Sequence, residues 1–269
     1  MKRAINLLVF VAVTLTGVVS EFGGAAVGAP AQAGDFRWRG AVAAGRTVEI
    51  RGVNGRVEAA PAAGGEVEVV AVKHARRSNP AEVRVEVVEH ADGVTICAVY
   101  PSTDPARPNV CAPGGEGRMS VNNNDVVVDF TVRVPAGVRL RGLTVNGDVE
   151  ARGLRSDVEA KTVNGSINVE TDGLASAKTV NGSITAAMGR ADWSGGLEFN
   201  TVNGGIELSL PASLSAEVEA ATLNGEIESD FPLTVTGRYS RRRLTGTVGG
   251  GGRELRLKTV NGSVHLKRG

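Results

Sequence analysis

The sequence predicts an all-β protein, a β-solenoid built from repeats of about 17–22 residues with Asn-Gly corners. The dipeptide Asn-Gly recurs seven times, and short runs of alternating apolar and polar residues flank it. Glycine supplies 36 of 269 residues, whereas aromatic residues make up only 4%. Frequent turns and a core of small β-branched residues are typical of a narrow structure with many strands.

Residues 1–33 have the features of a signal peptide. Lys2 and Arg3 precede the mostly apolar residues 4–19, and the small-x-small pattern Ala31-Gln32-Ala33 marks a cleavage point. Cleavage there predicts an exported protein, periplasmic or extracellular at the cell surface, with no integral membrane span afterwards. An uncleaved anchor is the alternative.

Residues 34–140 are predicted to be an irregular N-terminal β region. Residues 47–58 resemble one repeat, residues 67–73 and 83–89 alternate like strands, and residues 125–138 form a long strand pattern interrupted by Pro135. We interpret this region as the first coils of the solenoid with larger excursions, continuous with the repeats that follow. Such excursions would cap an otherwise open sheet edge.

Cys97 and Cys111 are the two cysteines of the chain, and in an exported protein an even count favours a disulfide. The segment between them contains three prolines and no strand pattern. Two unpaired buried thiols are the alternative. No metal site is expected, because two cysteines without a nearby histidine make a poor ligand set.

Residues 141–269 carry the regular repeats. Each Asn-Gly follows Val or Leu, Thr stands before that residue in six of seven copies, and Val or Ile comes two residues after the glycine. The spacings from Asn146 onward are 18, 17, 22, 21 and 37, so one degenerate or inserted unit is expected between Asn224 and Asn261. The predicted structural corners are Asn146, Gly147, Asn164, Gly165, Asn181, Gly182, Asn203, Gly204, Asn224, Gly225, Asn261 and Gly262.

Asn-Gly between alternating segments has two interpretations. The first is a type I′ hairpin turn, with positive φ at both residues. The second is a solenoid corner that stacks on the same corner in neighbouring coils. The repeat length favours the solenoid, because stacked asparagines can hydrogen-bond one another and a plain meander gives no reason to keep one turn sequence. Second strands are expected at residues 156–161, 173–178, 196–200, 216–221 and 253–258.

The T-V-N-G-S-I units, the V-P-A-G at residues 134–137 and the ending G-G-G-G-R-E-L-R-L-K-T-V-N-G-S-V resemble a bacterial β-strand-repeat family of unknown function. That family is labelled "putative adhesin" and is similar to auto-transporter adhesin head domains. The resemblance covers residues 48–266. It implies a β-solenoid in the cell envelope and carries over no catalytic residue.

We find no catalytic, cofactor-binding or metal-ligating constellation in the sequence, so no enzyme and no cofactor are predicted. His74, His90 and His265 each fit an exposed strand position, and residues 249–252 fit a flexible glycine turn rather than a phosphate loop. Asn123, Asn124 and Asp125 fit a turn better than a calcium site. A carbohydrate-active β-helix enzyme remains the alternative, with carboxylates that would have to converge on one face: Asp148, Asp157 and Asp172.

The net charge is +1, but charge is unevenly distributed. Residues 201–237 hold six acids and no Lys or Arg, whereas residues 238–269 hold nine Lys or Arg against Glu254 alone. A possible anion-binding patch comprises Arg241, Arg242, Arg243, Arg253 and Arg256. A solvated terminal coil is its alternative.

The predicted function is a non-catalytic exported cell-envelope protein, an adhesin-like or interaction scaffold. An anionic lipid- or polymer-binding envelope-stress module stays an alternative beside the enzyme. The partner is an unknown envelope polymer, lipid or protein. Nucleic acid is not expected, because the chain is exported and aromatic residues for base stacking are nearly absent from its basic segment.

Overall fold

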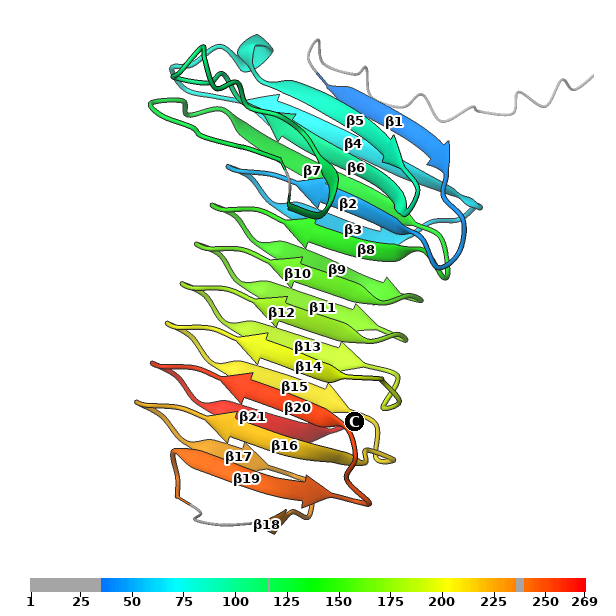
Figure 1. Cartoon of the computed structure of the whole chain (residues 1–269), viewed down its shortest axis with the longest axis vertical. Helices are drawn as coiled ribbons and strands as arrows, with labels where there is room; N and C mark the ends of the chain where they lie inside the picture. The colour runs from blue at the N-terminus through cyan, green and yellow to red at the C-terminus, as the bar shows by residue number, and fades with distance from the viewer. Residues whose placement is uncertain (1–34, 116, 236–239) are drawn as a thin grey trace, which may run out of the picture. The chain divides into compact units, whose positions relative to one another are not determined.

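The predicted β-solenoid is confirmed by two long sheets of 10 and 11 strands that face each other (Figure 1). The computed structural model describes residues 35–115, 117–235 and 240–269, so the predicted signal peptide lies outside the described residues. Each coil contributes one strand to each sheet, and neighbouring coils pair in parallel. The two strands around each Asn-Gly therefore belong to different sheets, which makes the hairpin interpretation wrong.

Seven coils each contain one Asn-Gly corner. In chain order their strand pairs are β2 (Thr47–Arg51) and β3 (Val57–Pro61), β8 (Arg139–Leu143) and β9 (Val149–Leu154), β10 (Val158–Lys161) and β11 (Ile167–Thr171), β12 (Ala175–Lys178) and β13 (Ile184–Met188), β14 (Gly196–Asn200) and β15 (Ile206–Leu210), β16 (Ala216–Ala221) and β17 (Ile227–Ser229), and β20 (Glu254–Lys258) and β21 (Val264–Arg268). The five second strands expected from the repeat pattern are β10, β12, β14, β16 and β20.

The coils do not stack in chain order. The last coil, β20 and β21, lies between the β14–β15 coil and the β16–β17 coil, and it pairs with both in parallel. Figure 1 shows its red strands between yellow and orange ones. The first coil, β2 and β3, likewise lies between β6–β7 and β8–β9. The first coil, β2 and β3, and the last coil, β20 and β21, are therefore paired with neighbouring strands on both edges.

The remaining elements extend or cap the stack. On the N-terminal side these are β1 (Phe36–Ala41), β4 (Glu66–His74), β5 (Arg84–His90), β6 (Gly93–Val99) and β7 (Val127–Val134), with the short 3₁₀ helices η1 (Pro80–Glu82) and η2 (Pro113–Gly115). The expected inserted unit between Asn224 and Asn261 contains β18 (Thr234–Val235) and β19 (Arg243–Val248). Strand β19 runs antiparallel to β16 and covers its edge. In the described ranges no helix is long and apolar enough to span a bilayer.

Inward-facing residues of the two sheets form one continuous core. Period-two alternation puts Ile167 and Val169 of β11 inside and Asn168 outside. Valine, isoleucine, leucine and alanine supply most of this core, as the composition predicts, and Tyr100, Phe130 and Phe199 are fully buried aromatic residues within it. Small inward residues such as Ala160 and Ala177 let the sheets approach closely over the regular coils.

The corner asparagines form a continuous ladder of side-chain hydrogen bonds. Each Nδ2 donates to the Oδ1 of the asparagine in the adjacent coil at 2.7–2.8 Å, in the spatial order Asn54, Asn146, Asn164, Asn181, Asn203, Asn261 and Asn224. The side chains are exposed, but each interior asparagine both donates and accepts once. The ladder is therefore continuous where the last coil lies between the β14–β15 and β16–β17 coils.

Threonine and glycine complete the corner. The buried Thr162 Oγ1 donates to the carbonyl of Gly147 at 2.8 Å, and the equivalent bond recurs in the other coils. A Cβ built on Gly165 would overlap that same Gly147 carbonyl. Positive φ does not explain the glycine at position 165, because the φ of Gly165 is outside the left-handed region. Close approach of stacked backbones is the actual reason.

Replacing Gly165 or Gly182 by Val should lower the free energy of unfolding by about 3 kcal/mol, because the new side chain would force two coils apart. The melting temperature should fall by roughly 6–12 °C. Gly64→Val is the matched control, since a Cβ at Gly64 meets nothing within 4 Å. Thermal melts that do not separate the corner variants from the control would contradict the stacked-corner explanation.

Asn181→Ala removes two ladder hydrogen bonds, whereas Asn224→Ala at the end of the ladder removes one. We expect the first to cost about 1–2 kcal/mol of unfolding free energy and the second about half of that. Chemical denaturation of both variants measures the difference. Equal costs would show that the side-chain ladder contributes nothing beyond the backbone of the corner.

Candidate functional site

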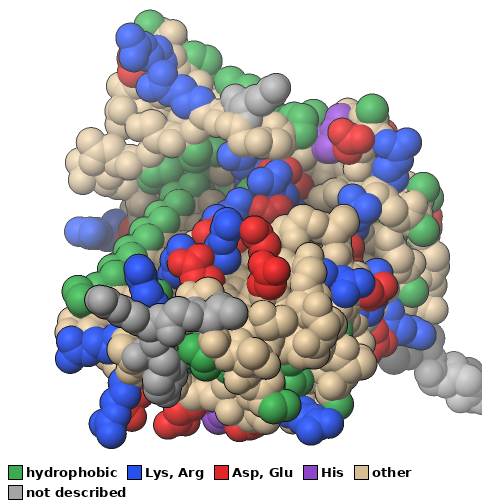
Figure 2. All heavy atoms as spheres, turned by 60° about the horizontal axis from the view of Figure 1, so that its bottom comes forward, with side chains coloured by type: hydrophobic (Ala, Val, Ile, Leu, Met, Phe, Trp, Pro, Cys, Tyr) green, Lys and Arg blue, Asp and Glu red, His purple; other side chains and the backbone are tan. Residues whose placement is uncertain are grey.

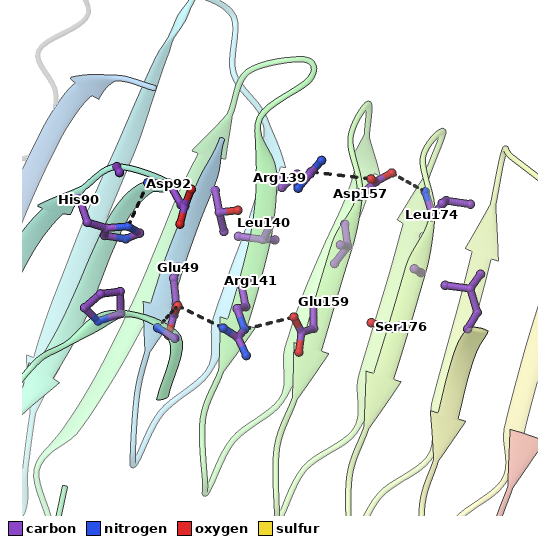
Figure 3. Close-up of a pocket in the computed structure, with 17 residues that line it drawn as sticks. Glu49, His90, Asp92, Arg139, Leu140, Arg141, Asp157, Glu159, Leu174 and Ser176 are labelled. Atoms are coloured by element: carbon purple, nitrogen blue, oxygen red, sulfur yellow. Dashed lines mark hydrogen bonds and ion pairs between the residues drawn. The ribbon is translucent and has the colours of Figure 1, made fainter. Parts of the chain in front are cut away.

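The candidate site is a groove of about 680 Å³ on the outward face of the 11-stranded sheet (Figure 3). We call it the charged groove. Strands β2, β8, β10 and β12 form its floor, and the segments around His90 and Pro113 rise beside it. Because these strands pair in register, Glu49, Arg141, Glu159 and Ser176 stand side by side across four coils.

Glu49 is the buried acid of the groove. The residue is 4% exposed, because the loop around η2 covers it. Its Oε2 accepts a hydrogen bond from the backbone N–H of Gly114 at 3.3 Å and lies 3.5 Å from Arg141 Nη1. Its Oε1 lies 3.6 Å from Arg51 Nε but accepts no hydrogen bond from the described residues. The two guanidinium groups offset the cost of burying the carboxylate, and Oε1 keeps an unused acceptor position.

The charges continue along the groove as alternating pairs. Arg141 Nε lies 3.1 Å from Glu159 Oε2, and Lys161 Nζ lies 2.5 Å from Glu159 Oε1. Nearer the loose turns, Arg139 Nε lies 4.0 Å from Asp157 Oδ2. The backbone N–H of Leu174 donates to Asp157 Oδ1 at 3.0 Å. Each carboxylate of this row thus has a cationic neighbour.

His90 is held in one orientation at the rim. Its Nδ1 accepts the backbone N–H of Asp92 at 3.3 Å, so the neutral ring carries its proton on Nε2. That Nε2 lies 3.1 Å from Thr95 Oγ1 and donates to it. His90 was expected at an exposed strand position, and the structure places it half-buried beside the groove.

The alternation is interrupted at Ser176. On the far side of Ser176, Glu198 occupies the outward position next to Phe199, which pairs with Ala177. The charges then resume as Glu198, Arg256 and Glu219. A hydrogen bond from Lys178, aided by one from Asn200, lowers the pKa of the Glu198 carboxyl. The short serine side chain leaves room between two acids, where the groove ends against Leu174 and Leu197.

A second cavity of about 540 Å³ lies under the excursion of residues 100–126, where it overhangs the corners of the first two regular coils. Cys97 and Cys111 form the predicted disulfide, with their Cα atoms 5.7 Å apart. It fastens the excursion to β6, and the buried Tyr100 hydroxyl donates to the carbonyl of Val126 at 2.8 Å. Burial raises the pKa of Tyr100 to about 12. The excursion therefore supplies walls to both cavities.

The predicted anion-binding patch does not lie in either cavity. Arg241, Arg242 and Arg243 stay together and exposed at the start of β19, beside the Asn224 corner. Arg253 lies at the opposite end of the strands, where its Nε donates to the Trp193 carbonyl. Arg256 lies between them and pairs with Glu219 and Glu254.

The carboxylates considered for hydrolysis lie at different ends of the coils. Asp148 follows a corner and accepts the backbone N–H of Ser166, whereas Asp157 and Asp172 lie in loose turns. His265 pairs with Asp230, and His74 lies 3.8 Å from Asp129. Within the described ranges no cluster of three or more His, Cys, Asp or Glu side chains could hold a metal ion.

Sequence reasoning named Asp157 and His90 but missed the central row of the charged groove. A signal was present, because this row and its continuation beyond the groove stand five positions before the corner asparagines: Glu49, Arg141, Glu159, Ser176, Glu198, Glu219 and Arg256. Aligning the repeats on asparagine would have shown the row. Nothing in the repeat pattern indicates that the excursion covers Glu49.

Comparisons with known proteins find a similarity over the repeat part of the chain. Residues 137–267 match the family model described as Toastrack DUF4097. That result agrees with the resemblance inferred from the T-V-N-G units. No curated protein matches the chain.

Three solved structures align with the chain at low similarity, and their descriptions mention adhesion. They are a "putative cell adhesion protein" from Clostridium sporogenes (11% identity, TM-score 0.45, all of that chain covered), a "putative adhesin" from Bacteroides fragilis (11%, 0.30, 96%) and a "putative adhesin" from Parabacteroides merdae (8%, 0.26, 97%). Each alignment covers 87% of the present chain.

Before reduction, Cys97 and Cys111 should be blocked to alkylation, and both should react after reduction. Removing the bridge with Cys97→Ala and Cys111→Ala should lower the unfolding free energy by about 3 kcal/mol, since the closed loop spans 14 residues. Mass spectrometry after alkylation and a thermal melt make the two measurements. Two reactive thiols in freshly purified, unreduced protein would contradict the bridge.

Proposed function

We propose that this protein is a non-catalytic, exported interaction scaffold of the cell envelope, and that the charged groove binds a hydroxyl-rich envelope glycan. The observation that carries the proposal is the row of paired charges in the groove, where Arg139 lies beside Asp157 and Arg141 lies between Glu49 and Glu159. A sugar chain offers hydroxyl donors to the acids and acceptors to the arginines. Binding sites commonly place such converging polar groups over a partly apolar floor.

Export is supported by two further features. The signal-peptide pattern of residues 1–33 predicts secretion. The Cys97–Cys111 disulfide fits an oxidising compartment, because reducing conditions inside the cell disfavour such bridges. The adhesin-like role expected from the family resemblance belongs to the same proposal, since a scaffold at the cell surface needs a binding face rather than a reaction centre.

The pairing of acids with cations supports binding rather than hydrolysis. Glycoside hydrolysis needs one carboxyl group to donate a proton and a second to act as base or nucleophile. In the charged groove, Glu49, Asp157 and Glu159 each face a guanidinium group. Each of these carboxylates is therefore already engaged by a cation of the chain itself.

The test is binding of residues 34–269 to purified envelope glycans by calorimetry or on an array. Ser176→Arg should fill the end of the groove while its guanidinium pairs with Glu159 and Glu198, and should weaken glycan binding by roughly tenfold or more. Asn168→Arg is the matched control, because Asn168 is exposed on the outward face of the other sheet beside Glu150.

Two results would contradict the proposal. Equal binding by both arginine variants would remove the groove as the site. Release of new reducing ends or unsaturated sugars from the bound glycan would replace the scaffold with a carbohydrate-active enzyme. Binding that is lost only in Ser176→Arg, with the melting temperature unchanged, is the expected outcome.

A further inference from the structure

A straight row of exposed aliphatic side chains runs along the corner edge, separate from the charged groove. We call it the aliphatic ridge; in spatial order it comprises Val145, Val163, Val180, Val202, Val260 and Leu223. The five valines are 36–39% exposed and Leu223 is 59% exposed. Figure 2 shows the ridge as a diagonal line of hydrophobic spheres.

The corner geometry forces these side chains outward. In each T-V-N-G unit the threonine is buried by its bond to a neighbouring glycine carbonyl, and the asparagine is held in the ladder. The residue between them has to project from the edge. Coils are spaced by about 4.8 Å, so the six side chains extend in line over about 24 Å.

The corner itself does not explain why these positions are aliphatic. The Val163 side chain is not part of the buried core, and the coil-to-coil bond here comes from its backbone, whose N–H donates to the carbonyl of Val145 at 3.2 Å. A serine or threonine would make the same backbone bond. Contiguous exposed apolar rows on soluble proteins mark contact surfaces.

Basic residues flank the ridge on the side of the 11-stranded sheet. Lys161, Lys178 and Lys258 each stand two residues before a ridge valine, and the other positions of that row in these coils are neutral: Leu143, Asn200 and Ala221. Each lysine shares its charge with a glutamate. The flank is therefore cationic next to the ridge, with its acids one row further away.

The three clustered arginines stand at the end of the ridge. The backbone N–H groups of Thr222 and Ile227, on either side of Leu223, donate to the carbonyls of Arg242 and Arg241. Arg241 has a side chain 84% exposed and pairs with Glu226 at 3.5 Å. Arg242 and Arg243 are exposed and make no ion pair within the described part of the chain. Leu223, the most exposed residue of the ridge, therefore lies beside the cluster of three arginines.

We propose that this edge docks on the surface of an anionic lipid bilayer. The aliphatic ridge enters the boundary between headgroups and acyl chains, and the flanking lysines and arginines contact lipid phosphates. An apolar stripe and the basic residues beside it contribute separately to binding at a membrane interface. The inference shares the envelope location of the proposed function but does not depend on the charged groove.

Self-association through the same edge fits the charges less well. A second copy packed in parallel would bring two Arg241–Arg243 clusters together. A copy packed antiparallel would bring that cluster to the opposite end of the edge, where Arg51 and Arg118 lie beside Val53. Both arrangements oppose like charges, whereas anionic headgroups complement the lysines and arginines that flank the ridge.

The test is flotation of residues 34–269 with vesicles, since residues 32–269 form one compact unit and the apolar N-terminal segment would bind lipid by itself. The protein should bind phosphatidylglycerol–phosphatidylcholine vesicles at low salt, and much less in 0.5 M salt or with phosphatidylcholine alone. The combined substitution Arg241→Ala, Arg242→Ala and Arg243→Ala should weaken binding by roughly fivefold for each arginine removed. Val163→Ser, Val180→Ser and Val202→Ser together should weaken it by roughly tenfold.

Matched controls separate this edge from general charge and hydrophobicity. Arg37→Ala, Arg76→Ala and Arg84→Ala change the net charge equally, and Val72→Ser removes a valine that is 40% exposed elsewhere. Both should bind vesicles like the wild type, and so should Ser176→Arg. Absent binding at low salt, or equal loss in the controls, overturns the proposal. A concentration-dependent dimer that only the ridge variants abolish also overturns it in favour of self-association.

Discussion

Close approach of the backbones at stacked Asn-Gly corners is the constraint on which the rest of the structure depends. In the six corners from Gly147 onward the glycine has no space for a Cβ, because the carbonyl of the glycine in the adjacent coil occupies it. That contact brings the asparagine side chains within hydrogen-bonding distance and puts the threonine hydroxyl on the same carbonyl. The corner thereby fixes the register of both sheets, since each flanking strand starts or ends at a defined height.

The sequence predicts the strands of the regular coils well, because the repeat unit and the period of two agree with each other. It also predicts the asparagine ladder and the disulfide. The sequence does not predict the spatial order of the coils. Every T-V-N-G corner is an equivalent partner for every other, so the repeat pattern does not tell β16–β17 from β20–β21 as the neighbour of β14–β15. The antiparallel hairpin of β18 and β19 decides it, because it returns the chain past β16 before the last coil forms.

This order of the coils protects the strand edges at the open end of the stack. The C-terminal coil, which would otherwise present two unpaired strand edges, lies inside the stack and is paired on both sides. The exposed edges are transferred to β17, which has only three residues, and to the short β18. Short edge strands offer a poor template for pairing with another chain. At the other end, the antiparallel strands β1 and β5 are the edges of the two sheets, and each covers the strand next to it, β4 and β6.

The charged groove could be predicted only in part. Its row of outward residues follows from aligning the repeats, but the burial of Glu49 depends on an irregular excursion whose prolines and glycines carry no periodic signal. Only one coil of the sheet places its acid, Glu49, under that excursion, so the groove is a local site that a single substitution can close. The predicted anion-binding patch is brought together only in part. Arg241, Arg242 and Arg243 are adjacent in the sequence and stay together, whereas the hairpin of β18 and β19 separates them from Arg253.

The aliphatic ridge, unlike the charged groove, is built from a repeated position of the coils. Each valine is one copy of a repeated position, and a single exposed aliphatic contact or ion pair contributes at most about 1 kcal/mol. Its effect has to come from summing identical contacts along a rigid line, because the coils hold all of them at fixed spacing without further loss of conformational entropy. A repeat protein can therefore change its affinity for a flat surface by adding or losing coils. The groove, built by one non-repeated loop, keeps its specificity independent of coil number, so the two surfaces can evolve separately on one scaffold.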